Sequence, residues 1–353
     1  MFMNSVPILE TYCMFFSQKN LPRVALLGSG GGQRANVGFL GVIQQLYKEE
    51  LLDGFLYVAG VSGSTWSVSV YVNGIWQRFL SKVCLLLYLE TRPLTDVKHQ
   101  HGANPYPLYS TFSKLQNSSS VTEMWFEFSP HESGFLQHGA YVDTSLLNKN
   151  FNRGHVNPSN KKQVDMVQLQ GFCYHTLTQE RLGQNIRIYL ELDPLTSHWY
   201  DMTLKKKMHL IDAGLYLNSP YPSVLGKARN IDLIISFDFS SGDPFEVKYA
   251  AATGHPFPKV NFRNLDPKRP KSYYVFEGKG KPTVIHIPLF NLDNCKDQKT
   301  IEKEKKEYKL LQLPYKDKAK IDHLAHLAEV NVSMNKHHIL EEIKKAVQRR
   351  SVH

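Results

Sequence analysis

The sequence predicts an α/β protein with a mainly parallel central sheet, and two consecutive segments carry this prediction. Each segment begins with a short apolar, β-prone run, passes through a glycine-containing turn and enters a stretch with the apolar spacing of a helix. The first strand is expected to begin near Arg23 and the second at Phe55, so residues 23–80 form a β-α-β-α unit. Parallel sheets built from such units bind ligands at the carboxyl ends of their strands.

The first loop of this unit is a glycine run at the start of a helix. Residues 28–36 read GSGGGQRAN, and apolar side chains follow at helical spacing from Val37 to Tyr47. Such a run exposes several backbone N–H groups at the positive end of a helix dipole. A phosphate loop would need a Gly-Lys-Ser/Thr ending, and a dinucleotide site would need an acid after the next strand, whereas Asp53 precedes it. An oxyanion hole is the use that also explains the next loop.

The second loop places Ser62 at a sharp strand-to-helix turn. Residues 60–66 read GVSGSTW, and Gly60 and Gly63 permit the tight turn that would lift the serine hydroxyl towards a substrate. The final position of the G-x-S-x-G pattern is Ser64 instead of glycine. An ordinary Gly/Ser turn is therefore the alternative interpretation.

A third apolar run ends in an aspartate that could act as the base. Residues 209–215 read HLIDAGL, so a strand end delivers Asp212 into a glycine-containing turn. A serine hydroxyl is a poor nucleophile until a base removes its proton. An aspartate can serve if a partly apolar site keeps its pKa from falling too low. The alternative interpretation is an ordinary turn aspartate.

The 15 histidines of the chain leave a Ser-His-Asp triad open. The order Ser62, Asp212 and then His255 or His286 suits an α/β-hydrolase. His286 lies in an apolar, strand-like run, where a structural histidine is more common, and His255 lies in a loop-like one. If the serine and the aspartate act alone, substituting both histidines should leave ester hydrolysis largely intact.

Several blocks together resemble the cytosolic phospholipase A2 family, its gamma-type branch without a C2 module, and more widely the patatin-like Ser-Asp lipases. The blocks are residues 28–35 (GSGGGQRA), 60–66 (GVSGSTW), 125–130 (WFEFSP), 212–222 (DAGLYLNSPYP) and 232–240 (DLIISFDFS). The resemblance implies a three-layer fold with helices on both faces of the sheet and a shortened cap or lid region.

The resemblance also implies a role for each of five residues. Ser62 would be the nucleophile and Asp212 the base. The backbone N–H groups of Gly31 and Gly32 would form the oxyanion hole, and Arg34 would hold the phospholipid phosphate with its planar, permanently charged fork. No metal or cofactor is implied. The activity implied is that of a calcium-independent phospholipase A2 or lysophospholipase that passes through an acyl-serine intermediate.

The alternative to an enzyme is a catalytically silent, membrane-binding relative with an incomplete site. The distance along the chain from Ser62 to Asp212 is shorter than in the resembled enzymes. We expect one catalytic domain over residues 1–353, in which 23–80 carry both loops, 90–207 form a shortened lid and middle region, and 208–353 form an aspartate-bearing core with a helical tail. A loop or lid remnant is expected over 90–120. Further strands are expected at 208–211, 231–239 and 283–287.

Composition sets the expected location of the protein. With 353 residues, 42% of them hydrophobic, the chain can bury a large core. Its four cysteines lack metal-ligand or redox spacing, which favours a reducing compartment. No apolar run approaches the roughly 18–20 residues that span a bilayer, so membrane contact would be peripheral. We therefore expect a cytosolic protein.

The net charge of +10 indicates what the surface could bind. Basic residues cluster at 205–207 and 344–350, where solvated faces are the ordinary explanation and anionic lipid headgroups the functional one. No nucleic-acid-binding motif accompanies the charge. The expected partners are glycerophospholipid and lysophospholipid substrates and the surface of intracellular membranes.

Overall fold

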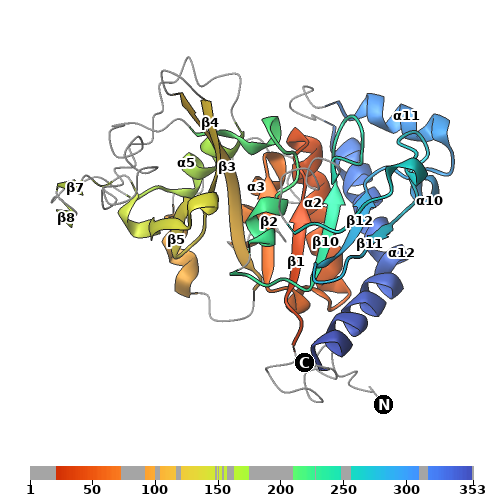
Figure 1. Ribbon diagram of the computed structural model, residues 1–353. Coiled ribbons are helices and arrows are strands. Elements are labelled where there is room, and N and C mark those ends of the chain that lie inside the picture. Colours follow the sequence, from red (N-terminus) through yellow and green to blue (C-terminus); the bar gives the residue numbers. More distant parts are fainter. Residues whose placement is uncertain are drawn as a thin grey trace, which may run out of the picture.

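A mixed β-sheet forms the centre of the computed structural model (Figure 1). The structure describes residues 21–72, 92–99, 104–116, 121–147, 149, 151–152, 155–156, 163–174, 210–226, 228–247, 256–309 and 317–351. Within these ranges the sheet has ten strands in the order β11-β12-β10-β1-β2-β3-β4-β5-β6, with β9 paired to β3. A separate ribbon pairs β7 (Phe151–Asn152) with β8 (His155–Val156).

The middle of the sheet is parallel and buried on both faces. Its five adjacent strands are, in order, β12 (Thr283–Pro288), β10 (Leu233–Asp238), β1 (Val24–Gly28), β2 (Tyr57–Val61) and β3 (Tyr106–Gln116). In β1, Val24 and Leu26 enter one hydrophobic core, whereas Ala25 and Leu27 enter another. A parallel sheet covered on both faces reads as continuous apolar runs, because neither face meets water. The predicted fold class is confirmed.

Antiparallel strands extend this parallel centre at both sides. At one edge β11 (Tyr274–Phe276) pairs with β12. On the other side β3 continues into a meander of β4 (Val121–Phe128), β5 (Glu132–Phe135) and β6 (Ala140–Asp143).

The prediction of a loop over residues 90–120 is wrong for much of that segment. A 3₁₀ turn, η3, occupies Leu94–His99, and the 11-residue strand β3 begins at Tyr106. Pro107 and several serines gave this segment the composition of a loop. Strand partners on both of its edges override that composition, because β-propensity depends on the surroundings more than on the residues themselves.

Helices cover both faces of the sheet. On one face α2 (Gly32–Lys48) and the long α12 (Lys318–Ser351) pack together beside α3 (Gly63–Val72) and α5 (Met166–Tyr174). The other core contains α8 (Tyr221–Leu225). The remaining short elements are α10 (Leu292–Cys295), α11 (Gln298–Glu307), η2 (Leu52–Gly54), η4 (Leu136–His138), η5 (Thr144–Leu146), η6 (Ala213–Leu215) and η7 (Phe262–Asn264).

The later strands and the tail follow the sequence predictions. The three strands expected in the last part of the chain appear as β9 (Leu210–Asp212), β10 and β12, and the helical tail appears as α12. Residues 73–91 and 175–209, which contain the end of the second expected helix and part of the expected lid region, lie outside the described residues. None of the described helices is both long and apolar enough to cross a membrane.

Candidate active site

Strand β3 brings the serine turn and the aspartate turn together. On one edge of β3, the last residue of β2, Val61, pairs with Ser110. On the same edge Asp212, the last residue of β9, pairs with the next residue, Thr111. Because β2 runs parallel to β3 and β9 runs antiparallel to it, the carboxyl ends of the two strands meet. Ser62 therefore lies beside Asp212, although the two are far apart in the sequence.

Ser62 occupies a strained turn between β2 and α3. Its backbone has φ 53°, in the left-handed region that residues other than glycine seldom adopt. A serine held at such a strand-to-helix turn is the arrangement called the nucleophile elbow. The turn packs tightly on the glycine loop, because a Cβ atom built on Gly63 would collide with the carbonyl oxygen of Gly32. Only 7% of the Ser62 surface is exposed.

Asp212 is placed to accept the proton of Ser62. The Ser62 side chain lies close enough to the Asp212 carboxylate to lower its pKa by hydrogen bonding, and the backbone N–H of Gly214 donates to the same carboxylate at 2.8 Å. Burial raises the pKa of Asp212 to about 6, against the lowering effect of these two hydrogen bonds. A carboxylate with a pKa near neutrality is a better base than an exposed one, because it binds a proton more tightly.

The glycine loop lies against the same serine. A Cβ atom built on Gly30 would be only 3.1 Å from the Cβ of Ser62. Gly31 is the N-cap of α2, and Gly32, with φ 58°, is its first residue. The first N–H groups of a helix have no acceptor within the helix. The structure thus brings Gly31 and Gly32 next to Ser62, and their role as oxyanion donors stays a prediction.

Arg34 is wholly buried beside this loop. Its Nε donates to the carbonyl oxygen of Phe239 at 2.8 Å, and its Nη1 donates to that of Tyr308 at 2.7 Å. A Cβ atom built on Gly31 would lie 3.3 Å from Nη2 of Arg34, so the guanidinium adjoins the glycine loop. In this conformation the side chain anchors the start of α2 to two other segments. Its role in holding a phosphate stays a prediction.

The histidine alternative receives no support from His286. This residue lies in β12, three strands away from β2, and its Nε2 is 2.6 Å from the carbonyl oxygen of Pro244. Burial lowers the pKa of His286, which is therefore neutral at physiological pH. His255, the other histidine considered, lies outside the described residues.

Sequence reasoning missed one polar residue at the site, Asn218. Its side-chain Nδ2 donates to the carbonyl oxygen of Gly30 at 2.9 Å and to Oγ of Ser240 at 2.8 Å. The backbone N–H of Gly30 in turn donates to the carbonyl oxygen of Asn218 at 2.7 Å. The block at 212–222 contains this asparagine, but its spacing from Asp212 carries no signal of a bond to a loop so distant in sequence.

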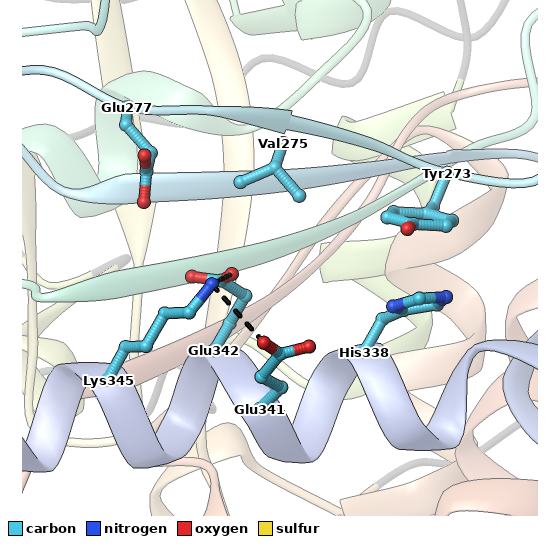
Figure 2. Close-up of a pocket in the computed structure, with 7 residues that line it drawn as sticks. All are labelled: Tyr273, Val275, Glu277, His338, Glu341, Glu342 and Lys345. Atoms are coloured by element: carbon cyan, nitrogen blue, oxygen red, sulfur yellow. Dashed lines mark hydrogen bonds and ion pairs between the residues drawn. The ribbon is translucent and has the colours of Figure 1, made fainter.

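A surface hollow of about 260 Å³ lies elsewhere, between β11 and α12 (Figure 2). Its lining residues are Tyr273, Val275, Glu277, His338, Glu341, Glu342 and Lys345. The Lys345 ammonium is 2.7 Å from a carboxylate oxygen of Glu342 and 3.6 Å from one of Glu341. The hollow shares no residue with the serine–aspartate site. Among the described residues, no group of three or more His, Cys, Asp or Glu side chains could hold a metal ion.

Comparisons with known proteins point to one family. A family model described as the lysophospholipase catalytic domain matches residues 24–82, which contain both loops of the site. The human cytosolic phospholipase A2 gamma is 29% identical, over 91% of this chain and 89% of the relative. The mouse cytosolic phospholipase A2 gamma is 26% identical, over 92% of this chain and 86% of the relative.

A solved structure shares the fold. The human GIVD cytosolic phospholipase A2 superposes with a TM-score of 0.75 at 20% sequence identity. The match covers 94% of this chain and 61% of that chain, so the protein spans less than two thirds of the solved structure. The alignment with the human gamma relative runs over 486 positions, whereas the chain has 353 residues, so at least 133 positions fall opposite gaps in this chain. The chain is thus similar to the cytosolic phospholipases A2 over nearly all of its length and shares the fold of a solved one.

Proposed function

We propose that the protein hydrolyses fatty-acyl esters of glycerophospholipids and lysophospholipids through a dyad of Ser62 and Asp212. The observation that carries the proposal is the meeting of Ser62 and the buried Asp212 carboxylate at the ends of two strands paired to the same edge of β3, next to the glycine loop. The relatives are phospholipase A2 enzymes, and the matched model is a lysophospholipase catalytic domain, so the chain is a phospholipid ester hydrolase.

The first half of the reaction would form an acyl-serine. Asp212 accepts the proton of Ser62 Oγ while the oxygen attacks the ester carbonyl carbon, and the carbonyl electron pair moves onto its oxygen. The backbone N–H groups of Gly31 and Gly32 stabilise this oxyanion. The tetrahedral intermediate then collapses, the bond to the lysophospholipid oxygen breaks, and that oxygen takes the proton from Asp212.

The second half would release the fatty acid by the same route. Water gives a proton to Asp212 and attacks the acyl carbon of the acyl-serine. Collapse of the second tetrahedral intermediate breaks the bond to Ser62 Oγ, which recovers the proton from Asp212. The nucleophile, the base and the oxyanion donors are all groups of this chain, which supports calcium independence as part of the proposal.

The proposal includes where the protein works. The names of the relatives call them cytosolic, and the net charge of +10 supports peripheral contact with anionic membrane surfaces. We place the protein in the cytosol, peripherally bound to intracellular membranes that present its substrates.

A fluorophosphonate probe tests the dyad directly. A human relative of this fold has been solved in complex with methyl gamma-linolenyl fluorophosphonate. We expect the purified protein to be labelled by an acyl fluorophosphonate, and labelling to disappear in both Ser62→Ala and Asp212→Asn. Activity on phosphatidylcholine should persist in EDTA. Absence of labelling in the folded wild-type protein would favour the second candidate, a catalytically silent membrane-binding relative, which the gaps in the alignment make worth testing.

Arg34→Ala tests the proposed phosphate contact. If the guanidinium binds the phosphate, this variant should lose at least tenfold more activity on a phospholipid than on a neutral, phosphate-free ester of the same acyl chain. Because Arg34 is buried and bonded to two backbone carbonyls, the melting temperature of the variant must be measured alongside. Equal losses on both substrates would assign Arg34 a structural role only.

A further inference from the structure

The side chain of Asn218 joins parts of the site that are remote in sequence. It lies after β9 and the turn of Asp212, yet it bonds the loop after β1 through Gly30 and the loop after β10 through Ser240. The Ser240 hydroxyl in turn donates to Asp238 at 2.9 Å. Each of these loops follows a strand at its carboxyl end, where the dyad also lies.

Asn218 binds Gly30 through both its backbone carbonyl group and its side-chain amide. The Asn218 carbonyl oxygen accepts the Gly30 N–H at 2.7 Å, and Nδ2 donates to the Gly30 carbonyl oxygen at 2.9 Å. Both hydrogen-bonding groups of one glycine are therefore fixed by one residue. The backbone N–H of Asn218 in turn faces the Glu246 carboxylate and lowers its pKa, against the raising effect of burial.

The Asn218 amide also borders both members of the dyad. A Cβ atom built on Gly30 would collide with Oδ1 of Asn218 and would lie 3.1 Å from the Cβ of Ser62. A Cβ atom built on Gly214 would lie 3.0 Å from that Oδ1 and 3.1 Å from Oδ1 of Asp212. The amide thus sits at the junction of the glycine loop, the nucleophile turn and the aspartate turn.

We propose that Asn218 is a positioning residue, which holds the Gly30 peptide so that the N–H groups of Gly31 and Gly32 stay directed at the oxyanion formed on Ser62. The inference rests on the proposed function. Backbone donors stabilise an oxyanion only if they are already oriented when the charge forms, since reorientation would consume the gain. Gly31 and Gly32 follow the clamped peptide directly, and glycines are the residues with the greatest freedom to drift from a productive conformation.

We call the hold of Asn218 on the Gly30 peptide the clamp. Two substitutions of Asn218 distinguish this clamp from a role of the side chain in packing alone. Asn218→Ala removes the side-chain bonds to Gly30 and Ser240, and Asn218→Asp keeps the shape but replaces the Nδ2 donor by an acceptor. Asn331→Ala is the matched control, because Asn331 is equally a hydrogen-bonded asparagine, buried between the carbonyl oxygens of Pro288 and Leu289 and the side chain of Asn291. Each variant is compared with the wild-type full chain.

The first readout is transition-state binding on a soluble, monomeric ester. We expect both Asn218 variants to lower kcat ten- to hundredfold while KM changes less than threefold. Affinity for an alkyl trifluoromethyl ketone, which forms a tetrahedral adduct with the serine oxygen, should fall in parallel with kcat/KM. Affinity for the amide that carries the same alkyl chain should not fall, because that amide stays planar. Asn331→Ala should lower the melting temperature without lowering the affinity for the ketone relative to that for the amide.

The second readout does not require turnover. Hydrogen–deuterium exchange over residues 28–34 should be faster in both Asn218 variants than in wild type, and unchanged in Asn331→Ala. If the Asn218 variants exchange at these residues as slowly as the wild-type protein does, the proposed clamp is overturned. Undiminished affinity of the variants for the ketone would overturn it as well. If the wild-type protein shows no Ser62-dependent turnover but exchange still responds to Asn218, the proposed function fails and the clamp stands.

Discussion

At the scale of single residues, catalysis and burial favour opposite protonation states of the Asp212 carboxylate. The base role proposed for Asp212 requires the charged form, yet burial disfavours that form and raises the pKa of Asp212 to about 6 from an ordinary value of 3.8. Between these two pKa values the folded protein binds the proton and the unfolded chain does not. Unfolding free energy therefore falls as the pH rises through this window and then levels off. Catalytic kcat/KM should rise through the same window.

Asp212→Asn should make the protein more stable and inactive at the same time. A shift of this size corresponds to about 3 kcal/mol at pH 7.5, where the wild-type carboxylate is charged. We expect the variant to gain about 1–3 kcal/mol of unfolding free energy at pH 7.5, because the amide avoids burial of a charge. At pH 4 the gain should vanish. Urea denaturation at the two pH values measures both effects, and a variant less stable than wild type at pH 7.5 would contradict the burial argument.

Most of the residue-scale site was accessible from sequence because it depends on short motifs. Ser62 at an elbow, glycines at a helix start and an acid at a strand end are local patterns, and the structure brings Ser62, Asp212, Gly31 and Gly32 together. Arg34 illustrates what a motif cannot show. Its bonds to Phe239 and Tyr308 join segments more than 200 residues away, so its complete burial could not be read from the local sequence.

At the scale of elements, the packing of the elbow on the glycine loop decides whether both keep their conformation. Gly63 and Gly32 approach so closely that no side chain fits between them. Gly63→Ala should therefore push the two loops apart and destabilise the protein by about 1–3 kcal/mol, as overpacking does. It should also remove nearly all esterase activity, since a shift of about 1 Å at such a site costs on the order of a hundredfold in rate.

The control for this prediction is Gly242→Ala. A Cβ atom built on Gly242 meets nothing within 4 Å, so the same change of residue should leave stability and activity within error of wild type. Denaturation curves and ester hydrolysis on both variants give the comparison. If Gly63→Ala behaves like Gly242→Ala, the contact between elbow and loop is not a constraint.

The element that sequence reasoning failed to find is β3, and the reason is physical. Ser110, Thr111 and Ser113 interrupt its apolar and aromatic residues without a strict alternation, and Pro107 near its start argues for an irregular segment. Three partners, β2, β4 and β9, supply the hydrogen bonds that make it a strand. Such pairing is non-local, so no window of the sequence contains it. Strands β1 and β10 were easier to predict, because each is a nearly continuous apolar run, which is a local signal.

At the scale of the whole molecule, the net charge of +10 predicts how membrane binding responds to salt. The screening length falls from about 10 Å at 0.1 M salt to about 3 Å at 1 M, which weakens attraction to anionic headgroups. We expect binding to vesicles that contain phosphatidylserine to weaken at least tenfold between 0.05 and about 0.5 M salt. Sedimentation with the Ser62→Ala variant measures this without hydrolysis of the vesicles. Equal binding to pure phosphatidylcholine would rule out the electrostatic account.

The meeting of β2 and β9 on one edge of β3 has a consequence for how the family can vary. The chain leaves β3 at residue 116 and returns as β9 at residue 210, and both anchor points belong to the same pair of strands. The entropy of closing an excursion between fixed ends changes only with the logarithm of its length, by about 0.6 kcal/mol for each doubling. The chain between these anchors also forms β4, β5, β6 and α5, so only length changes that spare these elements leave the pairing of β9 with β3 in place. Connections outside the packed elements can therefore vary in length while Ser62 and Asp212 stay side by side.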